Sequence, residues 1–122
     1  MCILLVEDEF IVRTAMAEAL KANGHNVWEA QTGDEAIEAI LSPPCVFTAL
    51  VTDYHMPGVA TGARVAAVMR GKLPAVPVII ATGSPEIFQP HWAREFGYRL
   101  LHKPYTPLEL ITVVNDMILD AT

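Results

Sequence analysis

The chain has 122 residues, enough for one hydrophobic core but too few for a second module, so we expect a single domain over residues 1–122. Hydrophobic residues make up 52% of the chain and charged residues 18%, which excludes a disordered protein. The net charge is -6, and no cluster of lysines or arginines offsets it, which argues against direct nucleic-acid binding. No apolar run approaches the roughly 18 residues of a membrane span, and no secretory leader precedes the first run, so we expect a cytoplasmic protein without membrane contact.

The two cysteines, Cys2 and Cys45, lie in apolar surroundings. In a cytoplasmic protein such cysteines are ordinarily small, reduced core residues. We therefore expect two free thiols and regard a disulfide as the less favoured alternative.

The first quarter of the chain predicts a strand, a helix and a second strand. Ile3–Val6 is a continuous apolar run, as expected of a strand buried on both faces of a parallel sheet. Phe10–Asn23 has helical spacing and is followed by Gly24, a favourable residue just beyond a helix end. The run Asn26–Glu29 then predicts the second strand.

The middle of the chain repeats this alternation. Thr32 and Glu35 match a capping box at a helix start, and Pro43 ends the helix that follows. Ala49–Thr52 predicts the third strand, and we expect the next helix to run from about Thr61 to Arg70.

The last third predicts two further strands, Val76–Ala81 and Leu100–Leu101. Between them we expect a short or interrupted fourth helix, because Pro90 would break a longer one. A second capping box over residues 106–109 predicts the start of the final helix. Strands that alternate with helices in this way indicate an open α/β sheet with right-handed crossovers.

Chemically active side chains follow the ends of four predicted strands. In open α/β sheets, functional groups gather outside the carboxyl ends of the strands, where the strand order reverses. If the first and third strands are neighbours, their acids share one pocket with a hydroxyl and an ammonium. The residues at these ends are Glu7, Asp8, Glu9, Asp53, Thr82, Gly83 and Lys103.

Such a pocket has a chemical requirement. Two carboxylates ~4 Å apart repel by about 4 kcal/mol at an effective dielectric constant of ~20, so either one is protonated or a cation lies between them. Carboxylate oxygens with room for water favour Mg²⁺. Asp53 would be a ligand and a nucleophile toward a phosphoryl group. Lys103 and the Thr82 hydroxyl would each contact a phosphate oxygen, and Gly83 would leave space for the incoming group.

The segments LLVEDE, TDYHMPG, VIIATG and HKPYTP, in this order and spacing, resemble the receiver domain of two-component response regulators over essentially the whole chain. The resemblance implies a flavodoxin-like, doubly wound parallel sheet of five strands in the order 2-1-3-4-5, with helices on both faces. It also implies roles for individual residues: Asp53 as phosphoacceptor, Asp8 as a direct Mg²⁺ ligand, Glu7 acting through water, the main-chain carbonyl of His55 as a further ligand, Thr82 as switch hydroxyl and Lys103 as phosphate-binding lysine.

By the same resemblance, a histidine kinase or histidine phosphotransferase would phosphorylate Asp53, and the change would switch a surface that binds a downstream protein. Such a domain catalyses only its own phosphorylation and dephosphorylation, so we do not expect a conventional enzyme. One alternative is a receiver excised from a hybrid kinase or larger regulator, and a homodimer is also left open. Less favoured alternatives are an aspartyl-phosphate hydrolase, a flavodoxin-like cofactor binder and a receiver that works without phosphorylation.

The sequence departs from the family pattern in the readout region. Leu100 stands three residues before Lys103, where the family often has an aromatic residue, and we expect the Tyr98 side chain to point to the other face of the strand. The segment MPGVATG carries one more residue than the common turn. His55 and Ser84 are expected to flank the phosphoryl group, and we hypothesise that they tune its lifetime.

Overall fold

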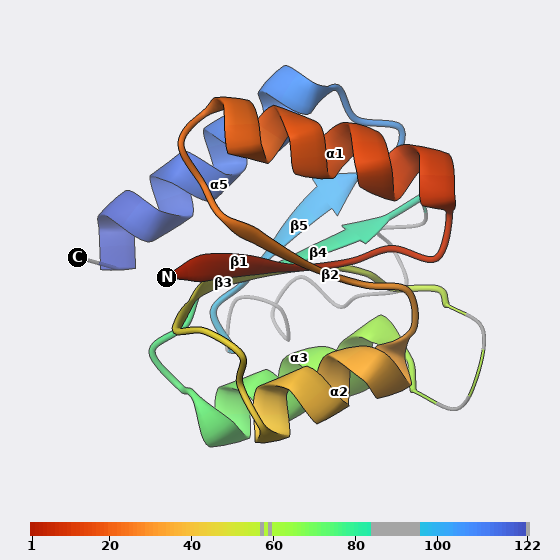
Figure 1. Ribbon diagram of the computed structural model, residues 1–122, viewed down its shortest axis with the longest axis vertical. Coiled ribbons are helices and arrows are strands. Elements are labelled where there is room, and N and C mark those ends of the chain that lie inside the picture. The colour runs from red at the N-terminus through yellow and green to blue at the C-terminus, as the bar shows by residue number, and fades with distance from the viewer. Residues whose placement is uncertain (57, 59, 84–95, 122) are drawn as a thin grey trace.

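A five-stranded parallel sheet forms the centre of the protein (Figure 1). The computed structural model describes residues 1–121 apart from 57, 59 and 84–95. The strand order is β2-β1-β3-β4-β5, which confirms the predicted doubly wound, flavodoxin-like sheet. The strands are β1 (Cys2–Val6), β2 (Val27–Ala30), β3 (Phe47–Asp53), β4 (Val78–Thr82) and β5 (Tyr98–His102).

Helices cover both faces of this sheet (Figure 1). On one face lie α1 (Phe10–Ala22) and α5 (Pro107–Ala121), and on the other lie α2 (Gly33–Leu41) and α3 (Gly62–Lys72). The predicted short fourth helix falls outside the described residues. Among the helices that the structure describes, none has the length and apolar character needed to span a bilayer.

Each face of the sheet has its own hydrophobic core. Toward α2 and α3, alternate strand residues such as Leu4, Leu50 and Ile80 pack together, and toward α1 and α5 the intervening residues, such as Leu5 and Ile79, do the same. Because β1, β3 and β4 are buried on both faces, their sequences are continuous apolar runs rather than alternating ones.

The predicted helix caps are present. The Thr32 side chain accepts a hydrogen bond from the Glu35 N–H at 3.1 Å, and Thr106 accepts one from the Glu109 N–H at 3.1 Å. Gly24 follows α1 with φ of 87°, a conformation that glycine adopts without steric cost. Local chemistry therefore sets these helix boundaries to within one or two residues.

Strand β5 is longer than predicted. It covers the five residues Tyr98–His102. The prediction found only Leu100–Leu101, because the exposed Arg99 and His102 interrupt the apolar pattern. The prediction that Tyr98 and Leu100 point to opposite faces is wrong: both pack in the core layer toward α2 and α3. Residues two apart on a strand share a face, so these two side chains lie on the same side of β5.

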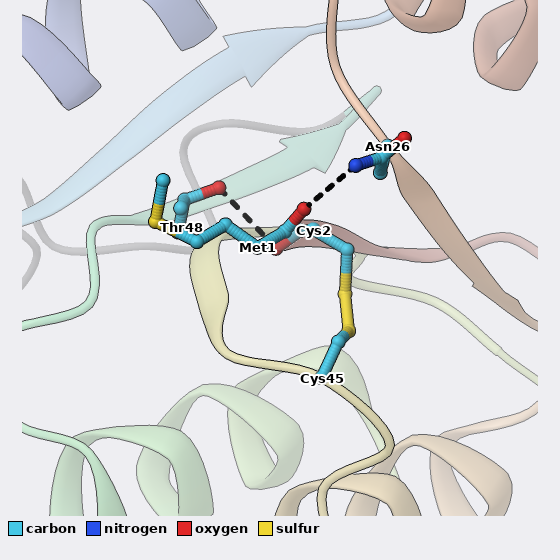
Figure 2. Close-up of a disulfide and its surroundings, with 5 residues drawn as sticks. All are labelled: Met1, Cys2, Asn26, Cys45 and Thr48. Atoms are coloured by element: carbon cyan, nitrogen blue, oxygen red, sulfur yellow. Dashed lines mark hydrogen bonds between the residues drawn. A yellow bond between two sulfur atoms is a disulfide. The ribbon is translucent and has the colours of Figure 1, made fainter.

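The prediction of two free cysteines is also wrong. Cys2 and Cys45 form a disulfide, with their Cα atoms 6.2 Å apart (Figure 2). The Cys2 N–H donates to the Val46 carbonyl at 2.8 Å, and Cys2 pairs with Phe47 in the sheet. The parallel pairing of β1 with β3 therefore brings together two cysteines that lie 43 residues apart in the sequence.

Candidate functional site

Three carboxylates meet at the carboxyl ends of the neighbouring strands β1 and β3. Glu7 and Asp8 follow β1 directly, and Asp53 is the last residue of β3. The parallel register pairs Val6 with Thr52, so the acids emerge at the same edge of the sheet. One carboxylate oxygen from each residue lies within 4.8 Å of the others. The predicted acidic pocket is therefore formed, with Glu7 and Asp53 buried and Asp8 half-buried.

Lys103 provides the positive charge of this pocket. It follows β5, and its backbone N–H donates to the Thr82 carbonyl at 2.9 Å, which joins it to the end of β4. The Lys103 ammonium forms an ion pair with Asp53 Oδ1 and lies 3.5 Å from Glu7 Oε2. Burial alone would lower the pKa of Lys103, but the adjacent Asp53 and then Glu7 outweigh burial and raise that pKa above its ordinary value. Lys103 is therefore protonated at neutral pH.

One cation does not balance the acids. Burial, followed by the hydrogen-bonding and charge of Asp53, raises the pKa of Glu7 from 4.5 to about 8, although the Glu9 N–H and Lys103 act in the opposite direction. The Glu9 N–H donates to Glu7 Oε1 at 3.1 Å, which fixes the carboxyl group toward the pocket. At neutral pH and without a further cation, Glu7 is mostly protonated.

The other predicted site residues differ in how far they are buried. Thr82 is buried at the end of β4, one strand beyond Asp53, and Gly83 is exposed just after it. His55 is exposed, and its ring lies edge-on to Tyr54 with centroids 4.8 Å apart. Ser84 lies outside the described residues, so its predicted position near the phosphoryl group stays a prediction.

Sequence reasoning assigned no role to Tyr105, which borders the site. Its phenol is partly buried among residues on the α1 and α5 side of the sheet. Burial raises its pKa, and the charges of Glu7 and Asp53 raise it further, so the ring is neutral and close enough to sense both acids. Tyr105 also lines a cavity of about 330 Å³ beside Glu9 and Lys103. The available signal was an aromatic residue directly after the Lys-Pro pair.

The donor set fits a small hard cation. All three candidate ligands are carboxylates, the group that Mg²⁺ prefers together with water and phosphate oxygens. Asp53 Oδ1 is buried and, within the described part of the chain, has no hydrogen-bond partner beyond its ion pair with Lys103. The raised pKa of Glu7 reflects the same excess of negative charge, which a divalent cation would relieve.

A family model described as the response regulator receiver domain matches residues 3–115 of the chain. A solved response regulator receiver protein from Sinorhizobium medicae has a TM-score of 0.85 and 27% sequence identity, and the match covers 100% of this chain and 97% of that one.

Two curated relatives are longer than this chain. The "Probable transcriptional regulator ycf29" of Pyropia yezoensis is 30% identical over 118 residues, and the match covers 95% of this chain and 52% of the relative. The "Sensor kinase CckA" of Brucella abortus is 31% identical over 117 residues, covering 95% of this chain and 12% of the relative. The chain thus spans about half of the first relative and a small part of the second.

Proposed function

Because the chain belongs to the response regulator receiver family, we propose that it accepts a phosphoryl group on Asp53 and thereby switches a protein-binding surface. The observation that carries this proposal is the buried Asp53 carboxylate at the end of β3, paired with Lys103 and flanked by two further acids. We assign the whole chain, residues 1–122, to this one domain.

The proposed reaction is a transfer between a donor imidazole and a carboxylate. An Asp53 oxygen attacks the phosphorus of a phosphohistidine on a histidine kinase or histidine phosphotransferase, the P–N bond breaks, and the imidazole leaves after taking a proton. Lys103 then contacts a phosphoryl oxygen, and the Thr82 hydroxyl donates to another. Attack of water on the same phosphorus breaks its bond to the Asp53 oxygen, releases inorganic phosphate and restores the carboxylate. We propose that His55 and Ser84 tune this hydrolysis.

We propose that Asp8 and Asp53 would hold Mg²⁺ directly, with Glu7 acting through water and the main-chain carbonyl of His55 as a further ligand. The ion, when bound, neutralises negative charge shared by the acids and the phosphoryl group. Burial of Asp53 supports its place in such a centre, since a buried carboxylate surrounded by acids needs positive charge nearby.

Two exposed apolar residues next to the site are candidates for contact with a phosphoryl donor. Phe10 and Ile11, in the first turn of α1 just after the acidic residues, are 69% and 82% exposed. Contiguous exposed apolar surface marks protein contacts, and we propose that these two residues form part of such a surface. The downstream partner would bind a different surface, and we propose a cytoplasmic location without direct nucleic-acid or membrane binding.

A second candidate differs only in context: the same receiver as one module of a hybrid kinase or larger regulator. The coverage of the two curated relatives favours it, because the matched part is 52% of one and 12% of the other. The chemistry at Asp53 would be identical, and the switched surface would act on a neighbouring module.

The test is intact mass after incubation with acetyl phosphate, with and without Mg²⁺, beside an Asp53→Asn control. We expect a gain of one phosphoryl group that requires Mg²⁺ and is absent from the control. Hydrolysis of an added phosphomonoester at many turnovers would instead support the hydrolase alternative. No gain with acetyl phosphate or with a phosphorylated histidine kinase would refute the proposal.

A further inference from the structure

The backbone of Asp53 has a neighbour closer than the sequence suggests. Helix α3 begins at Gly62, whose Cα lies against the main chain of Asp53 and Tyr54. A Cβ added at Gly62 would lie 2.7 Å from the Tyr54 Cα and closer still to the Asp53 carbonyl oxygen. Side chains essentially never approach backbone atoms this closely, so any residue other than glycine would displace α3 or the end of β3.

Hydrogen bonds hold the same stretch of backbone from three directions. The Thr52 hydroxyl donates to the Asp53 carbonyl at 3.0 Å, and Thr52 is fully buried. The Tyr54 N–H donates to the Ala81 carbonyl of β4 at 2.9 Å, and the Gly62 N–H donates to the Tyr54 carbonyl at 2.9 Å. The main chain that directly follows the Asp53 Cα is thus tied to β4 and to the start of α3.

We infer that Thr52 and Gly62 are positioning residues that set where the Asp53 carboxylate stands. The inference rests on the proposed phosphoryl transfer and deepens it. Neither residue acts on a reacting atom directly: Thr52 acts through the Asp53 carbonyl, and Gly62 acts by leaving room for it. A shift of this carbonyl would move the carboxylate away from Lys103 and the acidic pair.

Small shifts matter here because the transfer depends on alignment. A displacement of about 1 Å in a reacting group costs on the order of 100-fold in rate, because the attacking oxygen must approach phosphorus in line with the bond that breaks. The metal site is equally sensitive, since Mg²⁺ requires nearly ideal geometry from its ligands.

The first test compares two alanine substitutions in one helix. Gly62→Ala introduces the clash, whereas Gly71→Ala, near the end of the same helix, adds a methyl group that meets no atom within 4 Å apart from its chain neighbours and the backbone of its own helix. We expect Gly62→Ala to slow phosphoryl uptake from acetyl phosphate by about tenfold or more and to weaken Mg²⁺ binding measured by calorimetry. Gly71→Ala should match the wild type in both. Both measurements are made well below each variant's own melting temperature, where a loss of global stability alone would leave the protein folded and the two results unchanged.

The second test changes a hydrogen bond and introduces no clash. Thr52→Val keeps the shape and the β-branched character but removes the donor to the Asp53 carbonyl, and we expect phosphoryl uptake about threefold slower. Thr52→Ser keeps the hydroxyl and should restore most of the rate. If Gly62→Ala does not fold, the Thr52 pair decides the matter.

The inference is overturned if the folded Gly62→Ala or Thr52→Val variants take up phosphoryl groups and bind Mg²⁺ as the wild type does. Failure of the underlying function looks different, because then the wild type itself gains no phosphate from any donor. In that case the Mg²⁺ affinities still test the inference. Gly62→Ala should bind the ion more weakly than the wild type, and Gly71→Ala should bind it equally well.

Discussion

The two ends of the sheet are built on opposite principles. At the carboxyl ends of the strands, Glu7, Asp8 and Asp53 share a pocket with one lysine, and burial raises the pKa of Glu7 to about 8. At the amino ends, a disulfide joins Cys2 to Cys45, and the Thr48 hydroxyl donates to the Cys2 carbonyl at 3.2 Å (Figure 2). One end keeps unbalanced charge that a ligand would relieve, whereas the other is closed by a covalent bond and neutral hydrogen bonds.

This difference indicates how a small domain separates stability from chemistry. Crowded acids oppose folding unless they are protonated or bound to a cation, so the site end lowers stability. The cross-linked end compensates because it restricts the unfolded chain without touching the site. Measurements that affect only one end therefore test the comparison directly.

The largest expected effect is the pH dependence of the site end. Glu7 is protonated in the folded state up to about pH 8 but ionises near 4.5 when unfolded, so the unfolded chain binds fewer protons between these values. The free energy of unfolding should thus fall as pH rises through this range, by at most about 5 kcal/mol. Urea unfolding without divalent cations, at about pH 5 and about pH 9, measures the effect.

Glu7→Gln is the matched control, because glutamine keeps the shape and does not titrate. Its unfolding free energy should show a much weaker decline across the same range. An equally steep decline in the variant would show that Glu7 is not the responsible group.

The next effect concerns the cross-linked end. Reduction of the Cys2–Cys45 disulfide should lower the free energy of unfolding by about 4 kcal/mol, the loop-closure value for a sequence separation of 43 residues. Denaturant unfolding with and without a reducing agent measures this change, and Cys45→Ser should not respond to the reducing agent. Two free thiols in the untreated native protein would contradict the disulfide.

A smaller effect should follow from the addition of Mg²⁺. At about 100 times its dissociation constant, the ion should raise the free energy of unfolding by about 2.7 kcal/mol, because it binds the folded site alone. At one fixed Mg²⁺ concentration, the gain should be greater above pH 8 than near pH 5, because Glu7 must lose its proton to join the site and the affinity therefore rises with pH. Thermal unfolding of wild type and Asp53→Asn checks this, and equal stabilisation of the two would place the ion elsewhere.

The smallest effect is expected from Thr48→Val. The substitution removes the hydrogen bond to the Cys2 carbonyl and should cost about 1 kcal/mol of stability. Phosphoryl uptake at Asp53 should be unchanged, because Thr48 lies at the opposite end of the sheet. A changed uptake rate would show that the two ends are coupled.

The sequence was most informative where local chemistry decides the structure. The residue types of Thr32 and Glu35 are enough to predict a helix start. Acids directly after buried apolar runs indicate the functional edge of a parallel sheet. The gathering of Glu7, Asp8 and Asp53 was therefore predictable.

Long-range contacts were not predictable in the same way. The spacing of Cys2 and Cys45 carries no sign that the sheet pairing places them together. The contact of Gly62 with Asp53 was likewise hidden, because it depends on how closely α3 approaches the end of β3. The edge strand β5 mixes polar and apolar residues, so its length could not be read from hydrophobicity.

The ion pair between Lys103 and Asp53 has a consequence for how a message would be encoded. The lysine already stands beside the acid in the unmodified chain, so phosphorylation would not need to recruit a new cation. It would instead lengthen the Asp53 side chain with which Lys103 is paired, because phosphorus and three oxygens are added at the end of that side chain. The signal would then be carried by a displacement of Lys103 rather than by a change in the sign of the local charge. The backbone next to Lys103 would move with it.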